Sequence, residues 1–590
     1  MTKLALLLRA TGLLFCFLIS QAASTSHGQA SVSEACLSSE RDALLSFKAS
    51  LFDPAGRLSS WRRGDDCYQW KGVRCSNRTG HVIKLNLRNI NTDGYPLDMS
   101  RLLSLSAGEM SSSLATLQHL RYLDLSYNDF NGTSIPVFVG SLSNLRYLNL
   151  SSALFSGTIP SQLGNLSKLQ HLDVSWNCFY GRLQAGDLAW LPRLSLLTHL
   201  DMSYVDISFV RDWVHIFNML PSLKVLRLPG CELNTTMSAS NLHSMSNLTH
   251  LEVLAISDNN FYASLTHNWF WNLTSLKELY LSYCGWDGPI PSELRNMKSL
   301  QVIDLSTNYL DGLLPNNLED LCDLKVLILN GNNVNASMDE FMDRLPRCSM
   351  DTLQELSVGE TNMTGNLPVW IGNMTNLSVL EAYGNMLTGT LPVGVGALDN
   401  LKTLGLGSNN FSGVLLKEHF ASLHNLEFLD LGYNNFSAVL LREHFASLSN
   451  LEWLDLSYNN FNNFSLRNLK LLDLGCNNFS GVLRKKYSAS LGNLKHLDLS
   501  YNKLNSVLTE EDFAGLLNLE YLDLSHNSLK LAVNQKWVPP FRLKVAGFAS
   551  CHLGTQFPVW LRWQTDVDIL DLRYANLDDV IPDWFWVIFI

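Results

Sequence analysis

The motif Leu-x-x-Leu-x-Leu-x-x-Asn recurs about every 24 residues between Leu120 and Asp571. A repeat of 20 to 29 residues indicates coils that cannot bury their apolar edges alone and must stack on their neighbours. The sequence therefore predicts one elongated solenoid rather than several globular domains. We expect its function to lie on a long surface and not in a pocket.

Each repeat predicts a short strand followed by an asparagine turn. In the first coil, Leu123 and Leu125 point inward and Asp124 points outward, which is the alternation of a half-buried strand. Asn128 follows where the backbone turns inward, and its carboxamide can both donate and accept hydrogen bonds. We predict an α/β leucine-rich-repeat solenoid that is right-handed, with a parallel β-sheet on the concave face and 3₁₀ segments or loops on the convex side.

The asparagine column has interruptions. Cysteine replaces asparagine at Cys231, Cys284 and Cys551, and a small thiol still offers a weak donor. Apolar residues replace it at Ala153, Val205 and Ala575, where we expect local irregularity. The step from Asn459 to Asn477 is short, so we expect the solenoid to pinch there. The coils Phe411 to Asn434 and Phe436 to Asn459 are near copies of one another.

Several coils continue with Gly, a spacer, and Ile or Leu before Pro, as in Gly157-Thr158-Ile159-Pro160. This tail resembles the plant-specific leucine-rich repeat, in which it forms a second short strand. Proline ends such a strand because it has no N–H to donate.

The composition points to a secreted glycoprotein. A net charge of -11 argues against a nucleic-acid partner, and charged residues make up only 16%. Asn149 has a glycosylation sequence but lies in a predicted concave strand with little room for a sugar. We expect glycans at the other asparagines in Asn-x-Ser/Thr sequences: Asn77, Asn131, Asn165, Asn234, Asn247, Asn272, Asn335, Asn362, Asn373, Asn376, Asn410, Asn435, Asn463 and Asn478.

An export signal begins the chain. Lys3 and Arg9 precede an apolar run from Thr11 to Ser20, and small residues follow. We interpret residues 1–30 as a cleaved signal peptide. A membrane anchor is the alternative, although the run is shorter than the roughly 20 residues that span a bilayer.

Residues 31–80 do not repeat. A helical pattern around Leu44 and Phe47 precedes the segment Cys67-Tyr68-Gln69-Trp70-Lys71-Gly72-Val73-Arg74-Cys75. This region resembles the N-terminal cap of plant leucine-rich-repeat proteins, which covers the apolar edge of the first coil. We expect residues 81–590 to hold about 20 repeats and to end without a C-terminal cap.

The resemblance also bears on the cap disulfides. The family has two adjacent cysteines where this chain has Cys67 and Tyr68, the first pairing back to the start of the cap and the second pairing forward. One thiol is therefore missing, so Cys36 or Cys75 is left free or Cys67 has changed partner. We predict that Cys36 pairs with Cys67 and that Cys75 is free.

A second disulfide is plausible at Cys322 and Cys348, which lie in successive coils. Equivalent positions of neighbouring coils come near bonding distance. Two buried single thiols are the alternative. We find no Cys/His spacing of a metal site, no cofactor motif and no catalytic constellation, so we expect no enzymatic activity.

Aromatic residues occupy outward positions of the predicted strands. Because aromatic side chains dominate protein-binding hot spots, we predict a ligand-binding surface there. An acidic row that includes Asp124, Asp430 and Asp473 runs beside it. Both features have a plainer interpretation, since aspartate belongs to the repeat consensus and sheets favour aromatic residues. The candidate binding residues are Tyr122, Trp176, Tyr204, Tyr280, Tyr283, Phe428, Tyr433, Trp453, Tyr458, Tyr501 and Tyr521.

The segments Trp537-Val538-Pro539-Pro540-Phe541-Arg542-Leu543 and Leu345-Pro346-Arg347-Cys348 are more specific. With the cap, they resemble the plant leucine-rich-repeat receptor-like proteins, which include the tomato Cf resistance proteins and the ethylene-inducing xylanase receptor. The resemblance implies a cell-surface receptor without a kinase, which binds a peptide, protein or glycan and signals through a partner receptor kinase in defence or development.

The end of the chain departs from that family, whose members continue through further repeats and a membrane helix. The final apolar residues, from Trp584 to Ile590, are too few to span a membrane. As written, the chain is expected to be extracellular and C-terminally truncated. Two alternatives are a secreted inhibitor or decoy, similar to polygalacturonase-inhibiting proteins, and a nonfunctional receptor fragment.

Overall fold

The computed structural model describes residues 36–89, 104–108, 110–179, 181–234, 247–316, 318–437, 444–462, 469–481 and 492–589. The chain forms two compact units. The first comprises Met1–Leu169 and Phe179–Gly181, and the second comprises Gln170–Cys178 and Arg182–Ile590. The predicted signal peptide lies outside the described residues.

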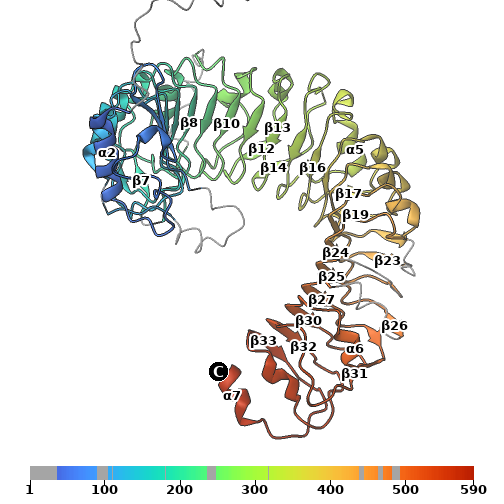
Figure 1. The fold of residues 1–590 in the computed structure, drawn as a ribbon. Helices are drawn as coiled ribbons and strands as arrows, with labels where there is room; N and C mark the ends of the chain where they lie inside the picture. Colours follow the sequence, from blue (N-terminus) through green and yellow to red (C-terminus); the bar gives the residue numbers. More distant parts are fainter. Residues whose placement is uncertain are drawn as a thin grey trace, which may run out of the picture. The chain divides into compact units, whose positions relative to one another are not determined.

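The first unit contains the cap and the first coils (Figure 1). Strand β1 pairs antiparallel with β2, and β2, β3 and β4 continue as a parallel sheet. Its elements are α2 (Ser38–Ala49), η1 (Cys67–Gln69), β1 (Val73–Cys75), β2 (Val82–Asn86), η2 (Ser112–Thr116), β3 (Tyr122–Asp124), η3 (Val137–Ser141), β4 (Tyr147–Asn149), β5 (Gly157–Thr158) and η4 (Ser161–Asn165).

The cap packs its helix against the first strands. Helix α2 buries Leu44 and Phe47, as the helical spacing predicted. Its buried Glu40 accepts hydrogen bonds from the backbone N–H of Val82 (2.6 Å) and contacts Nδ1 of His81 (2.9 Å). A buried carboxylate must be paired or hydrogen-bonded to be tolerated, so this contact fixes the helix on β2.

The second unit carries a parallel sheet in which neighbouring strands pair in register and place their central residues, mostly leucines, in the core. Its strands are β6 (His171–Asp173), β8 (His199–Asp201), β9 (Val225–Arg227), β10 (Val253–Ala255), β11 (Glu278–Tyr280), β13 (Val302–Asp304), β15 (Val326–Ile328), β16 (Glu355–Ser357), β18 (Val379–Glu381), β20 (Thr403–Gly405), β22 (Phe428–Asp430), β24 (Trp453–Asp455), β25 (Leu471–Asp473), β27 (His496–Asp498), β30 (Tyr521–Asp523), β32 (Val545–Gly547) and β33 (Ile569–Asp571).

Many coils contain a second, shorter strand after the strand of the main sheet. Several of these second strands lie in the proline-tailed coils. They form two-stranded parallel pairs apart from the main sheet. Their bounds are β7 (Leu183–Gln184), β12 (Asp287–Pro289), β14 (Tyr309–Asp311), β17 (Thr364–Gly365), β19 (Met386–Leu387), β21 (Ser412–Val414), β23 (Asn435–Ser437), β26 (Ser480–Gly481), β28 (Lys503–Leu504), β29 (Val507–Leu508) and β31 (Lys530–Leu531).

Helical segments complete the coils. In the C-terminal part of Figure 1, α6 and β31 lie on the side opposite to β27 and β30. The predicted leucine-rich-repeat solenoid is thus confirmed, with strands on one face and 3₁₀ segments on the other. These segments are η5 (Leu191–Arg193), α4 (Trp213–Asn218), η7 (Trp269–Asn272), η8 (Ser292–Asn296), α5 (Met338–Asp343), η9 (Arg347–Ser349), η10 (Val369–Asn373), η11 (Val393–Ala397), η12 (Lys417–Phe420), α6 (Glu510–Phe513), η14 (Val559–Trp563) and α7 (Asp583–Phe589).

The asparagine column forms a hydrogen-bonded ladder. Nδ2 of Asn308 donates to the carbonyls of Leu281 in the preceding coil and Leu305 in its own coil. Its Oδ1 accepts from the N–H groups of Cys284 and Trp286, both at 3.0 Å. Each asparagine therefore satisfies backbone groups of the coil before it, and buried groups of this kind are costly when unpaired.

The residue before the asparagine position adopts a left-handed conformation in coil after coil, and glycine or a larger residue occupies it. Tyr204 and Tyr574 keep this conformation before Val205 and Ala575, with φ of 62° and 56°. The turn is therefore kept without asparagine, and the irregularity expected at Val205 is not seen in its backbone. At Ala153 and Ala575 the next residue is left-handed as well, Leu154 with φ of 58° and Asn576 with φ of 60°, so these two coils do depart from the regular turn.

The short step from Asn459 to Asn477 leaves the sheet continuous. Strands β24 and β25 pair in register, with Leu454 opposite Leu472. Oδ1 of Asn477 accepts from Phe461 N–H at 3.1 Å, so the ladder also continues. The expected pinch concerns residues 463–468, which lie outside the described residues.

Candidate ligand-binding face and the cap cysteines

Three columns of outward side chains gather on strands β22 to β30. The first column stands at the start of each strand, the second is a row of aspartates, and the third is the left-handed position before each asparagine. We call this set the aromatic–acidic patch: Phe428, Trp453, His496, Tyr521, Asp430, Asp455, Asp473, Asp498, Asp523, Tyr433, Tyr458, Tyr501 and His526.

Rings of the patch stack between neighbouring coils. The centroids of Tyr433 and Tyr458 lie 3.9 Å apart, and those of Tyr501 and His526 lie 4.1 Å apart. In the first column His496 stacks on Tyr521 at 3.8 Å. Stacked rings are held in one orientation by their neighbours, so this surface loses little side-chain freedom when a ligand covers it.

The third column combines exposure with an unfavourable backbone. Tyr433, Tyr458 and Tyr501 are each about half exposed and have φ near 50°. Glycine fills the same position in other coils, at Gly331 and Gly384. A bulky residue in the left-handed region is disfavoured. The same conformation recurs in coils that carry other residues, such as Asp258, Thr307 and Glu360, so the turn imposes it and the tyrosines take it from the repeat.

The aspartate row of the patch is crowded with negative charge. Burial, with the charge of Asp455 added, raises the pKa of Asp430 to about 6 and that of Asp473 to about 7. Both residues are followed two positions later by glycine, Gly432 and Gly475, whose N–H groups donate to the carboxylates at 2.9 Å. Like charges on adjacent strands resist ionisation together. A cationic group placed on this row would relieve that repulsion.

One cluster of the patch could hold a metal ion. The ligand atoms of Asp473, His496 and Asp498 all lie within 4.8 Å of one another. Burial lowers the pKa of His496 to about 4, so its imidazole is neutral near pH 7 and able to coordinate. Sequence spacing had indicated no metal site, because these residues come from two neighbouring coils.

The first coils show the plainer role of the same consensus. Asp124 is buried, and its Oδ1 accepts from both the N–H and the hydroxyl of Ser126. Tyr122 stacks on Tyr147 at 4.1 Å and lies under the ammonium of Lys84 at 3.9 Å. The aspartate here stabilises the turn and offers little surface to a ligand.

The remaining candidate residues lie on other coils of the second unit. Trp176 packs on Tyr204 at 4.2 Å, and the hydroxyl of Tyr204 donates to Asp258 at 2.9 Å. Tyr280 bonds to Glu278 within its own strand, and Tyr283 is strongly exposed. The patch thus collects Phe428, Tyr433, Trp453, Tyr458, Tyr501 and Tyr521 of the candidates. The patch also contains His496, which the sequence analysis did not include. His496 occupies the same repeat position as Tyr521 one coil earlier, and that equivalence was the signal that could have identified it.

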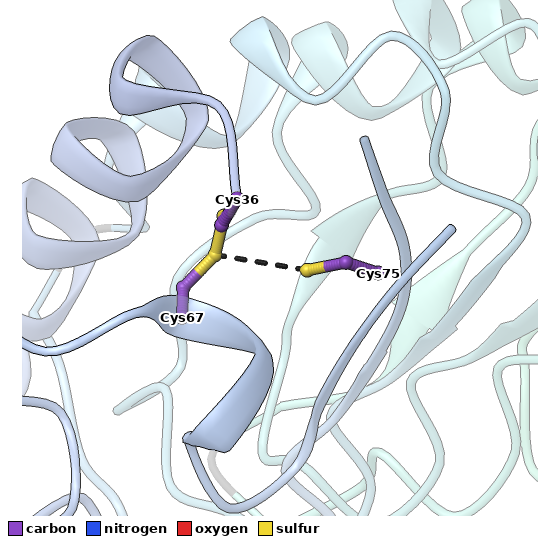
Figure 2. Close-up of side chains that lie close together, drawn as sticks. All are labelled: Cys36, Cys67 and Cys75. Carbon is purple, nitrogen blue, oxygen red and sulfur yellow. Dashed lines mark hydrogen bonds between the residues drawn. A yellow bond between two sulfur atoms is a disulfide. The ribbon is translucent and has the colours of Figure 1, made fainter. Parts of the chain in front are cut away.

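The cap cysteines lie together in the first unit. A disulfide joins Cys36 to Cys67, with a Cα separation of 5.7 Å. Figure 2 shows the sulfur of Cys75 beside that bond, 3.7 Å from the sulfur of Cys67. In the second unit a disulfide joins Cys322 to Cys348, with a Cα separation of 4.9 Å.

Most of the described asparagines in Asn-x-Ser/Thr sequences lie on the surface. Asn149 is buried and accepts hydrogen bonds from the N–H and hydroxyl of Ser151. Asn478 is half-buried, and Asn463 lies outside the described residues. The other twelve candidate asparagines are exposed.

Family comparisons agree with this architecture. A leucine-rich repeat N-terminal domain matches residues 37–76, and a leucine-rich repeat region matches residues 97–287. Leucine-rich repeat models match residues 299–321, 399–461 and 467–529. Fold and cap together define a leucine-rich-repeat protein with an N-terminal cap domain.

Two tomato proteins narrow the class. Receptor-like protein EIX1 of Solanum lycopersicum is 41% identical over 95% of this chain, and Receptor-like protein EIX2 is 38% identical over 93%. The chain belongs to the plant leucine-rich-repeat receptor-like proteins. It spans 52% and 51% of the length of these two relatives.

Solved structures share the fold at low identity. The ectodomain of the receptor kinase GASSHO1/SCHENGEN3 from Arabidopsis thaliana, in complex with CASPARIAN STRIP INTEGRITY FACTOR 2, is 22% identical with a TM-score of 0.58 and covers 92% of this chain and 77% of that one. The peptide hormone receptor RGFR1 in complex with RGF2 is 23% identical with a TM-score of 0.53, covering 88% and 85%.

Across the described residues, no helix combines the length and the apolar character that a membrane crossing demands.

Proposed function

We propose that this chain is the extracellular recognition module of a receptor-like protein and that the aromatic–acidic patch binds its ligand. The observation that carries the proposal is the coincidence of stacked, half-exposed tyrosines with a row of crowded carboxylates. Leucine-rich-repeat folds of this family generally bind and do not catalyse, so we assign no reaction and no cofactor.

The chemistry of the patch favours a ligand with basic groups. A lysine or arginine side chain could pair with the aspartates and lie over the faces of Tyr433 or Tyr458. Stacked rings also suit the apolar faces of sugars, so a glycan is the second ligand class. The net charge of -11 adds a long-range attraction for cationic partners.

Signalling would require a second protein. The family resemblance implies a partner receptor kinase at the cell surface, which would supply the catalytic activity, in defence or in development. A secreted inhibitor or decoy that uses the same patch is the alternative function. We propose that the twelve exposed sequons carry glycans and that the patch, which contains none of these sequon asparagines, stays uncovered.

Binding to peptides tests the proposal. Immobilised full chain would be probed with a panel of lysine- and arginine-containing peptides and with matched peptides in which those residues are neutral. We expect basic peptides to bind and Trp453→Ala or Tyr458→Ala to weaken binding at least tenfold, which is about 1.4 kcal/mol. The affinity should fall as salt is raised.

Tyr309→Ala is the matched control. Tyr309 is strongly exposed but starts β14, one of the second strands outside the main sheet. Equal loss of binding in Tyr309→Ala and Tyr458→Ala would show that the patch is not the binding site. Peptide binding that changes neither with the basic residues of the peptide nor with the patch substitutions would also contradict the proposal.

A further inference from the structure

Three sulfur atoms meet in the cap where one disulfide uses only two of them (Figure 2). Cys36 begins the described chain just before α2, Cys67 opens η1, and Cys75 ends β1. The third sulfur lies 3.7 Å from the disulfide sulfur of Cys67, and the ligand atoms of all three residues lie within 4.8 Å of one another. A thiol in contact with a disulfide is the starting geometry for exchange.

We propose that Cys36, Cys67 and Cys75 form a thiol–disulfide exchange site that gives the cap two alternative bridges. The Cys75 thiolate attacks Sγ of Cys67, a bond forms between Cys67 and Cys75, and the bond from Cys67 to Cys36 breaks. The electron pair leaves on Sγ of Cys36, which takes a proton from water. One disulfide and one thiol exist before and after, so no external oxidant or reductant is needed.

The cap can keep its fold under either bridge because other contacts tie the same elements. Oδ1 of Asp66 accepts from Cys36 N–H at 2.9 Å and from Tyr68 N–H at 3.3 Å, which holds the start of α2 to η1. Nζ of Lys48 donates to the carbonyls of Leu58 and Trp61, both at 2.8 Å. Exchange therefore requires a local rearrangement of sulfur atoms and not an unfolded cap.

The two bridges constrain the chain differently. The bridge from Cys36 to Cys67 closes a loop with a sequence separation of 31, while Cys67 and Cys75 are 8 apart. The entropy of closing a loop scales with the logarithm of its length, so the short loop forms about eightfold more readily in an unfolded chain. Packing of α2 in the folded cap opposes this preference, so both bridges are populated once exchange reaches equilibrium.

Charged groups around Cys75 set the speed of exchange. Burial, with the carboxylates of Asp66 and Glu40 added, raises the pKa of the Cys75 thiol to about 11. His81 faces the same carboxylate of Glu40 at 2.9 Å. Only the thiolate attacks, so exchange should be slow at neutral pH and accelerate about tenfold per pH unit below pH 11.

Peptide mapping of the full secreted chain tests the site. Lys71 and Arg74 separate Cys67 from Cys75, so trypsin places the three cap cysteines on different peptides. The protein would be incubated at pH 6, 8 and 9.5, alkylated to trap free thiols, deglycosylated at Asn77 and analysed by mass spectrometry. We expect a linked pair of Cys67 and Cys75 peptides to grow as the pair of Cys36 and Cys67 declines, fastest at pH 9.5.

Two variants make the result decisive. Cys75→Ser should keep the Cys36 pair intact at pH 9.5, which shows that exchange by the exposed Cys178 is not responsible. Cys36→Ser should be secreted with Cys67 joined to Cys75. The absence of the short-loop pair in the wild-type chain at pH 9.5, or two free thiols at Cys67 and Cys75 in Cys36→Ser, would overturn the proposal.

Discussion

Asp304 and Asp473 occupy the same position of the repeat but have different surroundings. Oδ1 of Asp304 accepts from the N–H of Ser306 at 2.9 Å and from its hydroxyl at 2.6 Å. Asp473 is followed by Gly475, which offers an N–H and no hydroxyl, and its pKa is raised to about 7. The consensus aspartate therefore stabilises the turn in one coil, whereas in another coil it adds a carboxylate to a row of like charges.

Asp304→Ala should give the largest effect. The substitution removes two hydrogen bonds to a charged acceptor and leaves the Ser306 groups without that partner, so we expect a loss of about 2 kcal/mol in the free energy of unfolding. Urea denaturation followed by circular dichroism measures it. If the free energy of unfolding falls no more in Asp304→Ala than in Asp473→Ala, the two aspartates do not differ in the way proposed.

Asp473→Asn should act in the opposite direction. The amide keeps an acceptor for the N–H of Gly475 and removes a carboxylate that repels Asp455 and Asp498. We expect a gain on the order of 1 kcal/mol at pH 8, since one pKa unit corresponds to about 1.36 kcal/mol and the site is partly screened by solvent. The same urea titration at pH 8 measures this gain, and Asp304→Asn, which should not stabilise, is the control.

The pH dependence of stability should follow Asp473 and Asp430. Their folded-state pKa values, about 7 and about 6, lie above the usual 3.8. Between these limits the folded state binds more protons than the unfolded state, so stability falls as the pH rises from 4 to 7. We expect the melting temperature to be roughly 2 °C higher at pH 5 than at pH 8 by calorimetry. An unchanged difference in Asp473→Asn would contradict this assignment.

Gly475→Ser should have the smallest effect and make the two coils alike. An added Cβ would lie 3.1 Å from Asp498 Oδ1 and 3.2 Å from Asp473 Oδ1, close enough to require a small shift. The new hydroxyl could donate to Asp473, lower its pKa and reduce the pH dependence in the same calorimetric scans. Gly407→Ser is the contrasting variant, since its Cβ would lie 2.4 Å from Asp430 Oδ2 and should destabilise the coil.

Much of the fold was predictable because each coil carries the same pattern of leucines and asparagine. The leucine spacing predicted the strands, and the asparagine predicted the ladder that Asn308 shows. The spacing around Leu44 and Phe47 predicted α2. These features are local, or repeat at one fixed period, so a single sequence reveals them.

Features that depend on neighbouring coils were harder to predict. The left-handed backbone at Tyr458 is set by the turn and not by tyrosine, which disfavours it. The charge crowding at Asp473 depends on Asp455 and Asp498 across the sheet. Likewise, the contact between Cys75 and the disulfide of Cys67 needs the cap to be folded first.

The asparagine ladder makes the number of coils easy to change during evolution. Nδ2 of Asn434 donates to Leu406 O, and Nδ2 of Asn459 donates to Leu431 O, each reaching the coil before it in the same way. A duplicated coil thus brings its own donors and finds acceptors already in place, as the near-identical segments ending at these two asparagines illustrate. Unequal recombination would lengthen the aromatic–acidic patch by about 4.8 Å at a time, each step adding another aspartate and another ring.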